Sequence, residues 1–345
     1  MRKYLFYISQ NYSFSILRPI QEVIRKEGGE VRWFFEGNAV NPNYLKGNEI
    51  RLDSVPAIFD FKPDVTLATA NSIPSFLPGL KTCVFHGFDA GKKKRNGEVD
   101  HFLIRGCFDL YCTQGPSTTR VFMQRQQELG FFNVIETGWP ALDPLFPLAQ
   151  PAPSSKPRIL FCSTFSKRLS AAPLLLSTIE EMSQRGNYQW KVQFHPKMPR
   201  EVVEGYLRIQ NENLEFVETD DIIPLLKEAD VMLSDTSSVI FMFLIQRKPV
   251  VTFRNIAPAP YLINITNEKN IEQALEQALK PSTELMAAIE HQALELHPYK
   301  DGKSAERVIE AIDDCLSGKY PLPRNRPLNL IRNLKYRKKL GYWKL

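Results

Sequence analysis

Long hydrophobic runs are missing from this sequence of 345 residues. The longest uninterrupted apolar stretch covers the seven residues from Val239 to Ile245, whereas a helix that crosses a bilayer needs about 20. At the N-terminus, Arg2 and Lys3 precede only the five apolar residues 4–8, fewer than the roughly 7 to 15 of a secretory signal. We therefore expect no membrane-spanning helix, no secretory signal, and a protein that remains in the cytoplasm.

Cysteine is scarce, and the common nucleotide and hydrolase motifs are absent. The five cysteines form no CxxC pair, and an odd number in a long chain suits reduced, buried thiols better than disulfides or a zinc site. The sequence contains no P-loop, dinucleotide-binding glycine, zinc-protease or serine-hydrolase signature. We expect no structural metal and no cofactor.

Acidic residues are missing from the C-terminal segment. Residues 319–345 contain nine Lys or Arg and no Asp or Glu, which leaves 35 basic and 38 acidic residues in the rest of the chain. The net charge of +6 therefore comes from the basic C-terminal tail, and the rest of the chain, its body, is nearly neutral. Such a body is not built to bind nucleic acid, so we expect no nucleic-acid partner.

Apolar runs alternate with helical patterns along the whole chain, which predicts an α/β fold with parallel sheets. Ligands of such sheets bind at the carboxyl ends of the strands. In the first half we expect strands at 4–8, 31–35, 65–68, 82–85 and 110–112, with a helix over 14–26. In the second half we expect strands at 158–162, 190–194, 214–217, 231–233 and 249–253, separated by helices and followed by helices near 271–279, 284–296 and 304–316.

Five prolines and no regular period mark residues 144–157 as a semi-rigid linker. We therefore predict two Rossmann-like domains whose parallel sheets face a central cleft. The predicted divisions are an N-terminal domain over 1–146, a proline-rich linker over 147–157, a C-terminal domain over 158–318 and a basic amphipathic tail over 319–345.

Two histidines follow predicted strands directly. His86 comes after strand 82–85, where an imidazole can act as a general base near neutral pH, and Lys92, Lys93 and Lys94 add positive charge nearby. The alternative is a solvated surface loop with an incidental histidine. His195 follows strand 190–194 and precedes a proline, which favours an extended backbone. It could donate a hydrogen bond to phosphate, or it could be a capping or core histidine.

The segment Ser234 to Ser238 is the strongest local signal, because it joins a strand to an apolar helix. Hydroxyls and free N–H groups at a helix N-terminus form an anion site. Ordinary capping by Asp235 or Thr236 is the alternative, but the number of hydroxyls exceeds what one cap needs, which favours phosphate binding. The polar loop 164–168 follows a strand of the same expected sheet, and at Asp301 to Ser304 helix capping is a sufficient explanation.

In their order along the chain, these motifs resemble the CDP-glycerol glycerophosphotransferase family of wall teichoic acid primases and polymerases, whose catalytic domain has a GT-B type fold. The resemblance rests on His86-Gly87 with the following Lys92-Lys93, Gly138-Trp139-Pro140 with Asp143, Phe161 to Phe165, His195-Pro196, Ser234 to Ser238 and Asp301 to Arg307. It implies a GT-B-like enzyme with an acceptor-side N-terminal domain and a nucleotide-donor C-terminal domain.

The resemblance also implies roles for individual residues. His86 would be the general base, and His195 and Asp235 would complete the catalytic group, with Asp235 orienting its loop. Donor binding would fall to Thr164, His195, Ser237, Ser238 and Lys303. Lys92, Lys93 and Lys94 would supply charge for the acceptor or a phosphate. No metal is implied, because helix N-termini and cations can hold a pyrophosphate.

The function implied is transfer of a glycerol-phosphate or related polyol-phosphate group from a CDP-linked donor to a hydroxyl of a glycan or lipid-linked acceptor in bacterial surface-polysaccharide synthesis. One alternative is a GT-B glycosyltransferase that uses a nucleotide sugar for capsule or lipopolysaccharide synthesis. Another is a non-catalytic scaffold for polysaccharide assembly, bound to the membrane.

The tail sequence from Leu328 repeats apolar residues beside cations at helical spacing. This pattern predicts an interfacial amphipathic helix that binds an anionic membrane surface, which would make the enzyme peripheral on the inner face of the cell membrane. The alternative is a C-terminal helix packed across the first domain, with its lysines in solvent.

Overall fold

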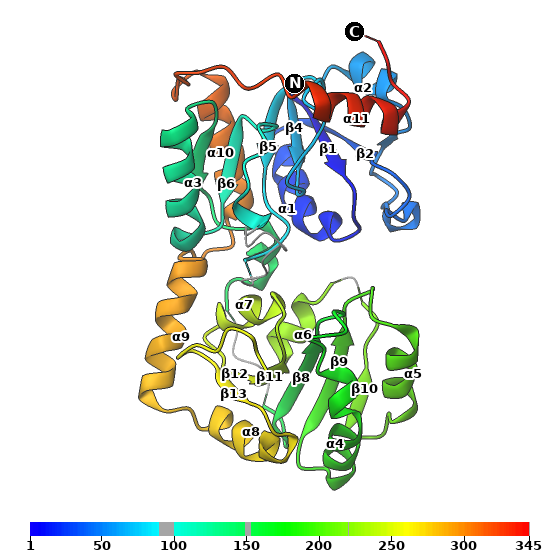
Figure 1. Ribbon diagram of the computed structural model, residues 1–345, viewed down its shortest axis with the longest axis vertical. Helices are drawn as coiled ribbons and strands as arrows, with labels where there is room; N and C mark the ends of the chain where they lie inside the picture. Colours follow the sequence, from blue (N-terminus) through cyan, green and yellow to red (C-terminus); the bar gives the residue numbers. More distant parts are fainter. Residues whose placement is uncertain (90–99, 149–152, 220, 345) are drawn as a thin grey trace. The chain divides into compact units, whose positions relative to one another are not determined.

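A computed structural model describes residues 1–89, 100–148, 153–219 and 221–344, and these form two compact units (Figure 1). Among the described residues, unit 1 comprises residues 1–88, 100–146 and 297–344. Unit 2 comprises residue 89 and the described part of 147–296. Each unit is built on its own parallel sheet.

Within the described residues, the sheet of unit 1 has seven strands in the order β3-β2-β1-β4-β5-β6-β7, all paired in parallel. The strands are β1 (Lys3–Ile8), β2 (Glu30–Phe35), β3 (Arg51–Leu52), β4 (Val65–Ala68), β5 (Leu80–Cys83), β6 (Leu110–Thr113) and β7 (Asn133–Glu136). The helices are α1 (Ser13–Lys26), α2 (Val55–Phe61), α3 (Pro116–Leu129), α10 (Ser304–Leu316) and α11 (Leu330–Leu340). Because helices cover both faces of such a sheet, its central strands are continuous apolar runs, as in β1, where residues 4–8 are all buried.

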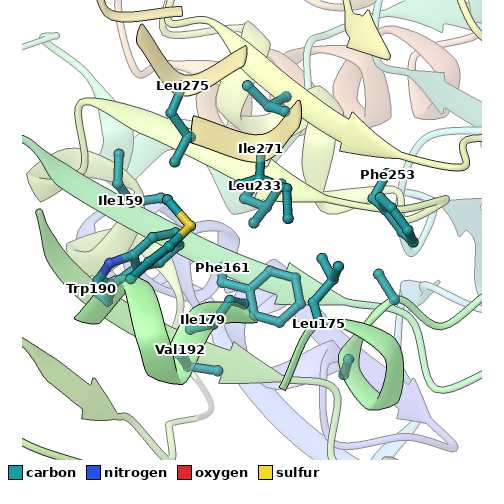
Figure 2. Packing of buried hydrophobic residues seen from close by; sticks show 14 of the residues in the cluster. Ile159, Phe161, Leu175, Ile179, Trp190, Val192, Leu233, Phe253, Ile271 and Leu275 are labelled. Carbon is teal, nitrogen blue, oxygen red and sulfur yellow. The ribbon is translucent and has the colours of Figure 1, made fainter. Parts of the chain in front are cut away.

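In the part of unit 2 that the structure describes, six parallel strands follow the order β10-β9-β8-β11-β12-β13. They are β8 (Arg158–Ser163), β9 (Gln189–Phe194), β10 (Leu214–Phe216), β11 (Val231–Ser234), β12 (Val250–Phe253) and β13 (Ile263–Ile265). The helices are α4 (Ala172–Arg185), α5 (Arg200–Arg208), α6 (Ile223–Glu228), α7 (Val239–Leu244), α8 (Ile271–Leu279) and α9 (Thr283–Leu296). Figure 2 shows the core, in which Trp190 and Phe161 of the sheet pack with Leu175 of α4 and Leu275 of α8.

The predicted fold class, α/β with two parallel sheets, is confirmed. Three short strands were not predicted from the sequence: β3, β7 and β13. All three lie at the edges of their sheets. An edge strand has one neighbour and is only partly buried, so it need not carry the apolar run by which the central strands were recognised.

Residues 297–318 were predicted to belong to the C-terminal domain, but the structure assigns them to unit 1. Helix α10 packs against α1 and buries Val308, Ile309 and Ile312. The N–H groups of Ser304 and Ala305 at its start donate hydrogen bonds of 2.9 and 2.7 Å to the carboxylate of Asp143. The chain therefore leaves unit 2 at the end of α9 and returns to unit 1.

The C-terminal tail is a helix that packs on unit 1, which was the alternative expected for it. The Tyr336 hydroxyl of α11 is hydrogen-bonded to Ser72 at 2.7 Å, and Asn333 accepts a 3.0 Å hydrogen bond from the Ser75 N–H. The ring of Tyr342 stacks on Phe59, with centroids 5.4 Å apart. Across residues 1–89, 100–148, 153–219 and 221–344, no helix is long and apolar enough to cross a membrane.

Candidate active site

The His86 loop is anchored by two hydrogen bonds to its backbone. The chain leaves β5, passes through a left-handed conformation at Phe85 (φ 45°) and exposes His86. A left-handed bulky residue costs about 1–3 kcal/mol, so the surrounding structure must hold it in place. The Trp139 indole N–H donates to the Phe85 carbonyl at 3.2 Å, and the Gln114 amide donates to the Gly87 carbonyl at 2.8 Å. Both peptide carbonyls that flank His86 are therefore fixed.

Two aromatic residues lie beside His86. The ring centroid of Tyr12 is 5.8 Å from that of His86, and the ring centroid of His101 is 6.4 Å away. His101 also stacks on Phe85, at 5.2 Å. Tyr12 and His101 belong to no sequence motif, so they could not be identified before the structure. Trp139 belongs to the Gly138-Trp139-Pro140 motif of the resemblance, but the sequence indicated no role for it.

In unit 2, Asp235 is fully buried and holds two loops together. Its carboxylate accepts hydrogen bonds from the Ser163 hydroxyl (2.5 Å), from the Thr164 N–H (3.0 Å) and from the Ala171 N–H (2.9 Å). Burial raises the pKa of this carboxyl, and the hydrogen bonds partly oppose that shift. With its oxygens occupied by the loop after β8, Asp235 is placed to orient the loop after β11.

The predicted alternative of an ordinary helix cap at Ser234 to Ser238 is not observed. The N-cap residue of α7 is Ser238, and it makes no side-chain capping hydrogen bond. The Asp235 carboxylate is used elsewhere, and the Thr236 hydroxyl accepts a 3.2 Å hydrogen bond from the Ile256 N–H. Ser237 is half-buried and Ser238 is exposed, and within the described residues neither hydroxyl is engaged in a hydrogen bond. Both hydroxyls are therefore available to a ligand.

His195 is exposed at the carboxyl end of β9, and a hydrogen bond determines which ring nitrogen can donate. Its Nδ1 accepts a 3.0 Å hydrogen bond from the Lys197 N–H, so the proton of the neutral ring is on Nε2. The His195 ring lies 4.5 Å, between centroids, from Phe165 in the loop after β8. The predicted role of a phosphate hydrogen-bond donor requires this tautomer.

Most predicted donor-binding residues of unit 2 lie at the carboxyl ends of the strands of its sheet. Strands β9, β8, β11 and β12 are parallel neighbours, so the loops that carry His195, Thr164 and Ser237 leave the sheet at the same end of these strands. The Asn255 side chain after β12 donates a 2.7 Å hydrogen bond to the Asp235 carbonyl. Sequence reasoning missed Asn255, which only the folded chain places beside this loop.

Lys303, the remaining predicted donor-binding residue, does not belong to unit 2. Lys303 is exposed and belongs to unit 1, where it precedes a helix whose first N–H groups are already bound by Asp143. Burial raises the pKa of the Asp143 carboxyl, and hydrogen bonds from the helix start oppose the shift. Segments 138–143 and 301–307, which both belong to the resemblance, are therefore hydrogen-bonded to each other within unit 1. Lys92, Lys93 and Lys94 lie outside the described residues.

Metal ligands are not clustered in the structure. Over the described ranges, no group of three or more His, Cys, Asp or Glu side chains could hold a metal ion. The chemical groups that these loops offer are hydroxyls, imidazoles and backbone N–H groups, which suit recognition of phosphate oxygens.

Comparison with known proteins confirms the resemblance. Residues 87–257 match the model of the family described as CDP-glycerol:poly(glycerophosphate) glycerophosphotransferase. No curated protein matches the chain.

Solved structures resemble the chain at low sequence identity. A variant of the wall teichoic acid polymerase TagF soaked with CDPG is 15% identical with a TM-score of 0.69, and the match covers 92% of this chain and 90% of that one. The S. aureus protein MnaA in complex with UDP is 17% identical with a TM-score of 0.65, and the match covers 95% of this chain and 100% of that one. The UDP-GlcNAc 2-epimerase of Neisseria meningitidis is 13% identical with a TM-score of 0.60, and the match covers 90% of this chain and 100% of that one. The fold is therefore GT-B-like, as predicted.

Proposed function

We propose that this chain transfers glycerol phosphate from CDP-glycerol to a hydroxyl group of a teichoic-acid-like polymer. The premise is the match of residues 87–257, which makes the chain an enzyme of the CDP-glycerol glycerophosphotransferase type. The observation that carries the proposal is the loop of Ser237 and Ser238. Their hydroxyls make no hydrogen bond within the described residues, and the buried Asp235 fixes the loop that presents them.

Unit 2 supplies the donor-binding groups in this proposal. The hydroxyls of Ser237 and Ser238 and the Nε2–H of His195 donate hydrogen bonds to the pyrophosphate oxygens, and Thr164 lies at the same sheet edge. Donors that are already oriented gain most where negative charge develops at phosphorus, because they need no reorganisation during the reaction. Asp235 acts as a positioning residue, since its carboxylate contacts protein donors.

His86 supplies the base. The oxygen of the acceptor hydroxyl attacks the phosphorus that carries glycerol, the bond from that phosphorus to the bridging oxygen breaks, and CMP leaves with this oxygen. His86 accepts the proton of the attacking hydroxyl. The anchored carbonyls of Phe85 and Gly87 restrict the position of the imidazole, which is the condition for efficient proton transfer.

The tail suits attachment to an anionic membrane surface, where a lipid-linked acceptor would be found. Although α11 packs on unit 1, its apolar residues Leu330, Ile331 and Leu334 are 66%, 73% and 54% exposed, and Trp343 beyond the helix is 60% exposed. Exposed Leu, Ile and Trp beside cations have the composition of an interfacial helix. This attachment would make the enzyme peripheral on the cytoplasmic face of the membrane.

The decisive experiment is a donor panel. The purified protein is incubated with CDP-glycerol, CDP-ribitol and common UDP- and GDP-sugars, each with and without a lipid-linked glycan acceptor, and release of CMP, UDP or GDP is measured. Acceptor-dependent release of CMP from CDP-glycerol supports the proposal. Release of UDP or GDP alone would identify a glycosyltransferase, and release of no nucleotide would leave a non-catalytic scaffold. The His86→Ala variant is the control for nucleotide release that does not depend on the base.

A further inference from the structure

Unit 1 contains an open pocket of about 690 Å³ at the carboxyl ends of its strands. Its walls include residues 9–10 after β1, residues 36–39 after β2 and Ala70 after β4, and the helix α11 closes one side. Strands β2, β1, β4 and β5 are consecutive neighbours in the sheet. His86 follows β5, so the pocket and the proposed base lie along the same edge of the unit 1 sheet. This size lies within the range of small-molecule sites.

One face of the tail helix lines the pocket. Arg332, Lys335, Tyr336 and Lys339 all border it, and their spacing of i, i+3, i+4 and i+7 places them on a single face of a helix. This face differs from the exposed apolar surface of residues 330, 331 and 334. Helix α11 therefore presents charged groups to the pocket and apolar groups to solvent.

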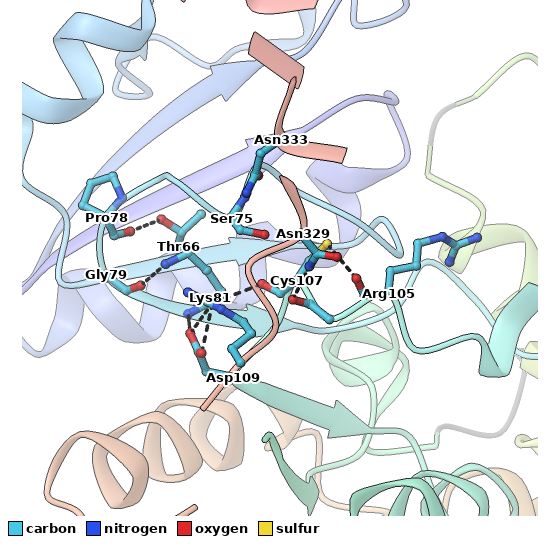
Figure 3. Close-up of polar contacts among 12 residues, drawn as sticks. Thr66, Ser75, Pro78, Gly79, Lys81, Arg105, Cys107, Asp109, Asn329 and Asn333 are labelled. Carbon is cyan, nitrogen blue, oxygen red and sulfur yellow. Dashed lines mark hydrogen bonds and ion pairs between the residues drawn. The ribbon is translucent and has the colours of Figure 1, made fainter. Parts of the chain in front are cut away.

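Segment 105–109 holds the tail in this position. The Arg332 guanidinium donates a 3.0 Å hydrogen bond to the Arg105 carbonyl. The Asn329 side chain donates to the Gly106 carbonyl at 2.7 Å, and Arg326 donates to the Asp109 carboxylate at 3.0 Å (Figure 3). These contacts fix the tail as one wall of the pocket.

The lining carries more positive than negative charge. Arg105, Arg332, Lys335 and Lys339 contribute four cations, and Glu36 is the only carboxylate among the residues that line the pocket in the described structure. Glu36 is paired with Lys339. The exposed Lys335 makes no ion pair or hydrogen bond within the residues described. A pocket with this excess of cations is suited to an anion, and Arg and Lys together favour phosphate oxygens.

We propose that this pocket binds a phosphate group esterified to a polyol, at the acceptor end of the reaction. The inference rests on the proposed function and adds to it a recognition site for the phosphate of the acceptor. Its volume leaves room for the polyol beside the phosphate. Two sources share this chemistry: a phosphate of the growing polymer and a phosphoglycerol lipid headgroup.

The binding test uses soluble probes and two matched variants. Lys335→Glu and Lys338→Glu reverse the charge of two exposed lysines on the same helix, but only Lys335 lines the pocket. Calorimetry with glycerol 3-phosphate at low salt should give about ten-fold weaker binding for Lys335→Glu and a less than two-fold change for Lys338→Glu. Equal effects of the two variants, or no binding to the wild type, would overturn the inference. Unchanged thermal melting of both variants confirms that they fold.

A second probe distinguishes the two sources. Dihexanoyl phosphatidylglycerol, used below its micelle concentration, presents the lipid headgroup without a membrane. Tighter binding of this probe than of glycerol 3-phosphate, with the same dependence on Lys335, identifies a lipid headgroup as the source. Equal or weaker binding that still depends on Lys335 identifies the polymer phosphate. Binding of both probes that is insensitive to Lys335→Glu counts against the pocket.

Transfer assays separate a failure of this inference from a failure of the proposed function. If CDP-glycerol is used and Lys335→Glu raises the KM for acceptor about ten-fold without changing the affinity for CDP-glycerol, both proposals hold. If transfer occurs and the two variants have the same acceptor KM, the pocket assignment is wrong and the function stands. If no transfer from CDP-glycerol occurs but Lys335→Glu alone weakens probe binding, the function is wrong and the phosphate site stands.

Discussion

Replacing Trp139 by Phe should slow catalysis by displacing His86, although Trp139 itself takes no part in the proposed proton transfer. The substitution keeps an aromatic ring at a position that is 4% exposed, but it removes the N–H that donates to the Phe85 carbonyl at 3.2 Å. A buried carbonyl left without a partner costs about 1–3 kcal/mol. Phe85 occupies a left-handed conformation (φ 45°) and is expected to relax once this hydrogen bond is lost.

The size of the effect follows from the position of Phe85 next to the base. A displacement of about 1 Å in a catalytic group can cost up to 10²-fold in rate, so we expect kcat to fall 10- to 100-fold. Affinity for CDP-glycerol, measured by calorimetry, should stay within two-fold, because the proposed donor-binding residues belong to unit 2. Initial-rate kinetics at saturating donor and acceptor measure the change in kcat.

Trp190→Phe provides a matched control. Trp190 is also buried, but its indole N–H has no hydrogen-bond partner in the part of the chain that the structure describes. Its replacement therefore costs packing without breaking a hydrogen bond. Thermal melting of both variants measures the stability lost through packing, whereas kcat measures the effect of displacing His86. If Trp139→Phe retains wild-type kcat, or if Trp190→Phe loses as much, the proposed anchoring of His86 is refuted.

Three further predictions address the base, the donor loop and the tail. His86→Ala should reduce turnover 10²- to 10⁴-fold with little change in melting temperature; retention of more than about a tenth of the turnover excludes His86 as the base. Replacing Ser237 and Ser238 together by Ala should weaken CDP-glycerol binding, at about 1.5–3 kcal/mol per lost hydrogen bond to charged phosphate, and an unchanged calorimetric affinity would leave the loop without a role in donor binding. Replacing the exposed Ile331 and Leu334 by Ser should reduce sedimentation with phosphatidylglycerol vesicles while leaving the melting temperature unchanged, and equal sedimentation of variant and wild type would contradict membrane attachment.

The central strands of both sheets could be predicted from the sequence because burial on two faces requires continuous apolar residues. The edge strands β3, β7 and β13 could not, since partial burial leaves no comparable pattern. The return of α10 to unit 1 depends on the contact of Ser304 with Asp143, 161 residues earlier in the chain. No local feature of either segment indicates this contact.

Contacts between segments far apart in the chain also limit what the sequence can predict about the site. His86 and His195 were identified because each directly follows a strand, and the structure places both at carboxyl ends of strands. Tyr12 and His101 come near His86 only through folding. Asp235 carries no sequence sign that its carboxylate is consumed by the loop after β8.

The return of residues 297–344 to unit 1 affects how the chain can fold during synthesis. Domains commonly fold in order as they leave the ribosome, at about 5–20 residues per second. Unit 1 begins first, yet α1 lacks its partner α10 until the last part of the chain is made. Unit 2, which is nearly continuous in sequence, can complete its core earlier. At those rates the N-terminal segment waits on the order of 10–40 s for its final helices, so a gene fragment that stops at the proline-rich segment encodes a first unit with an uncovered apolar face.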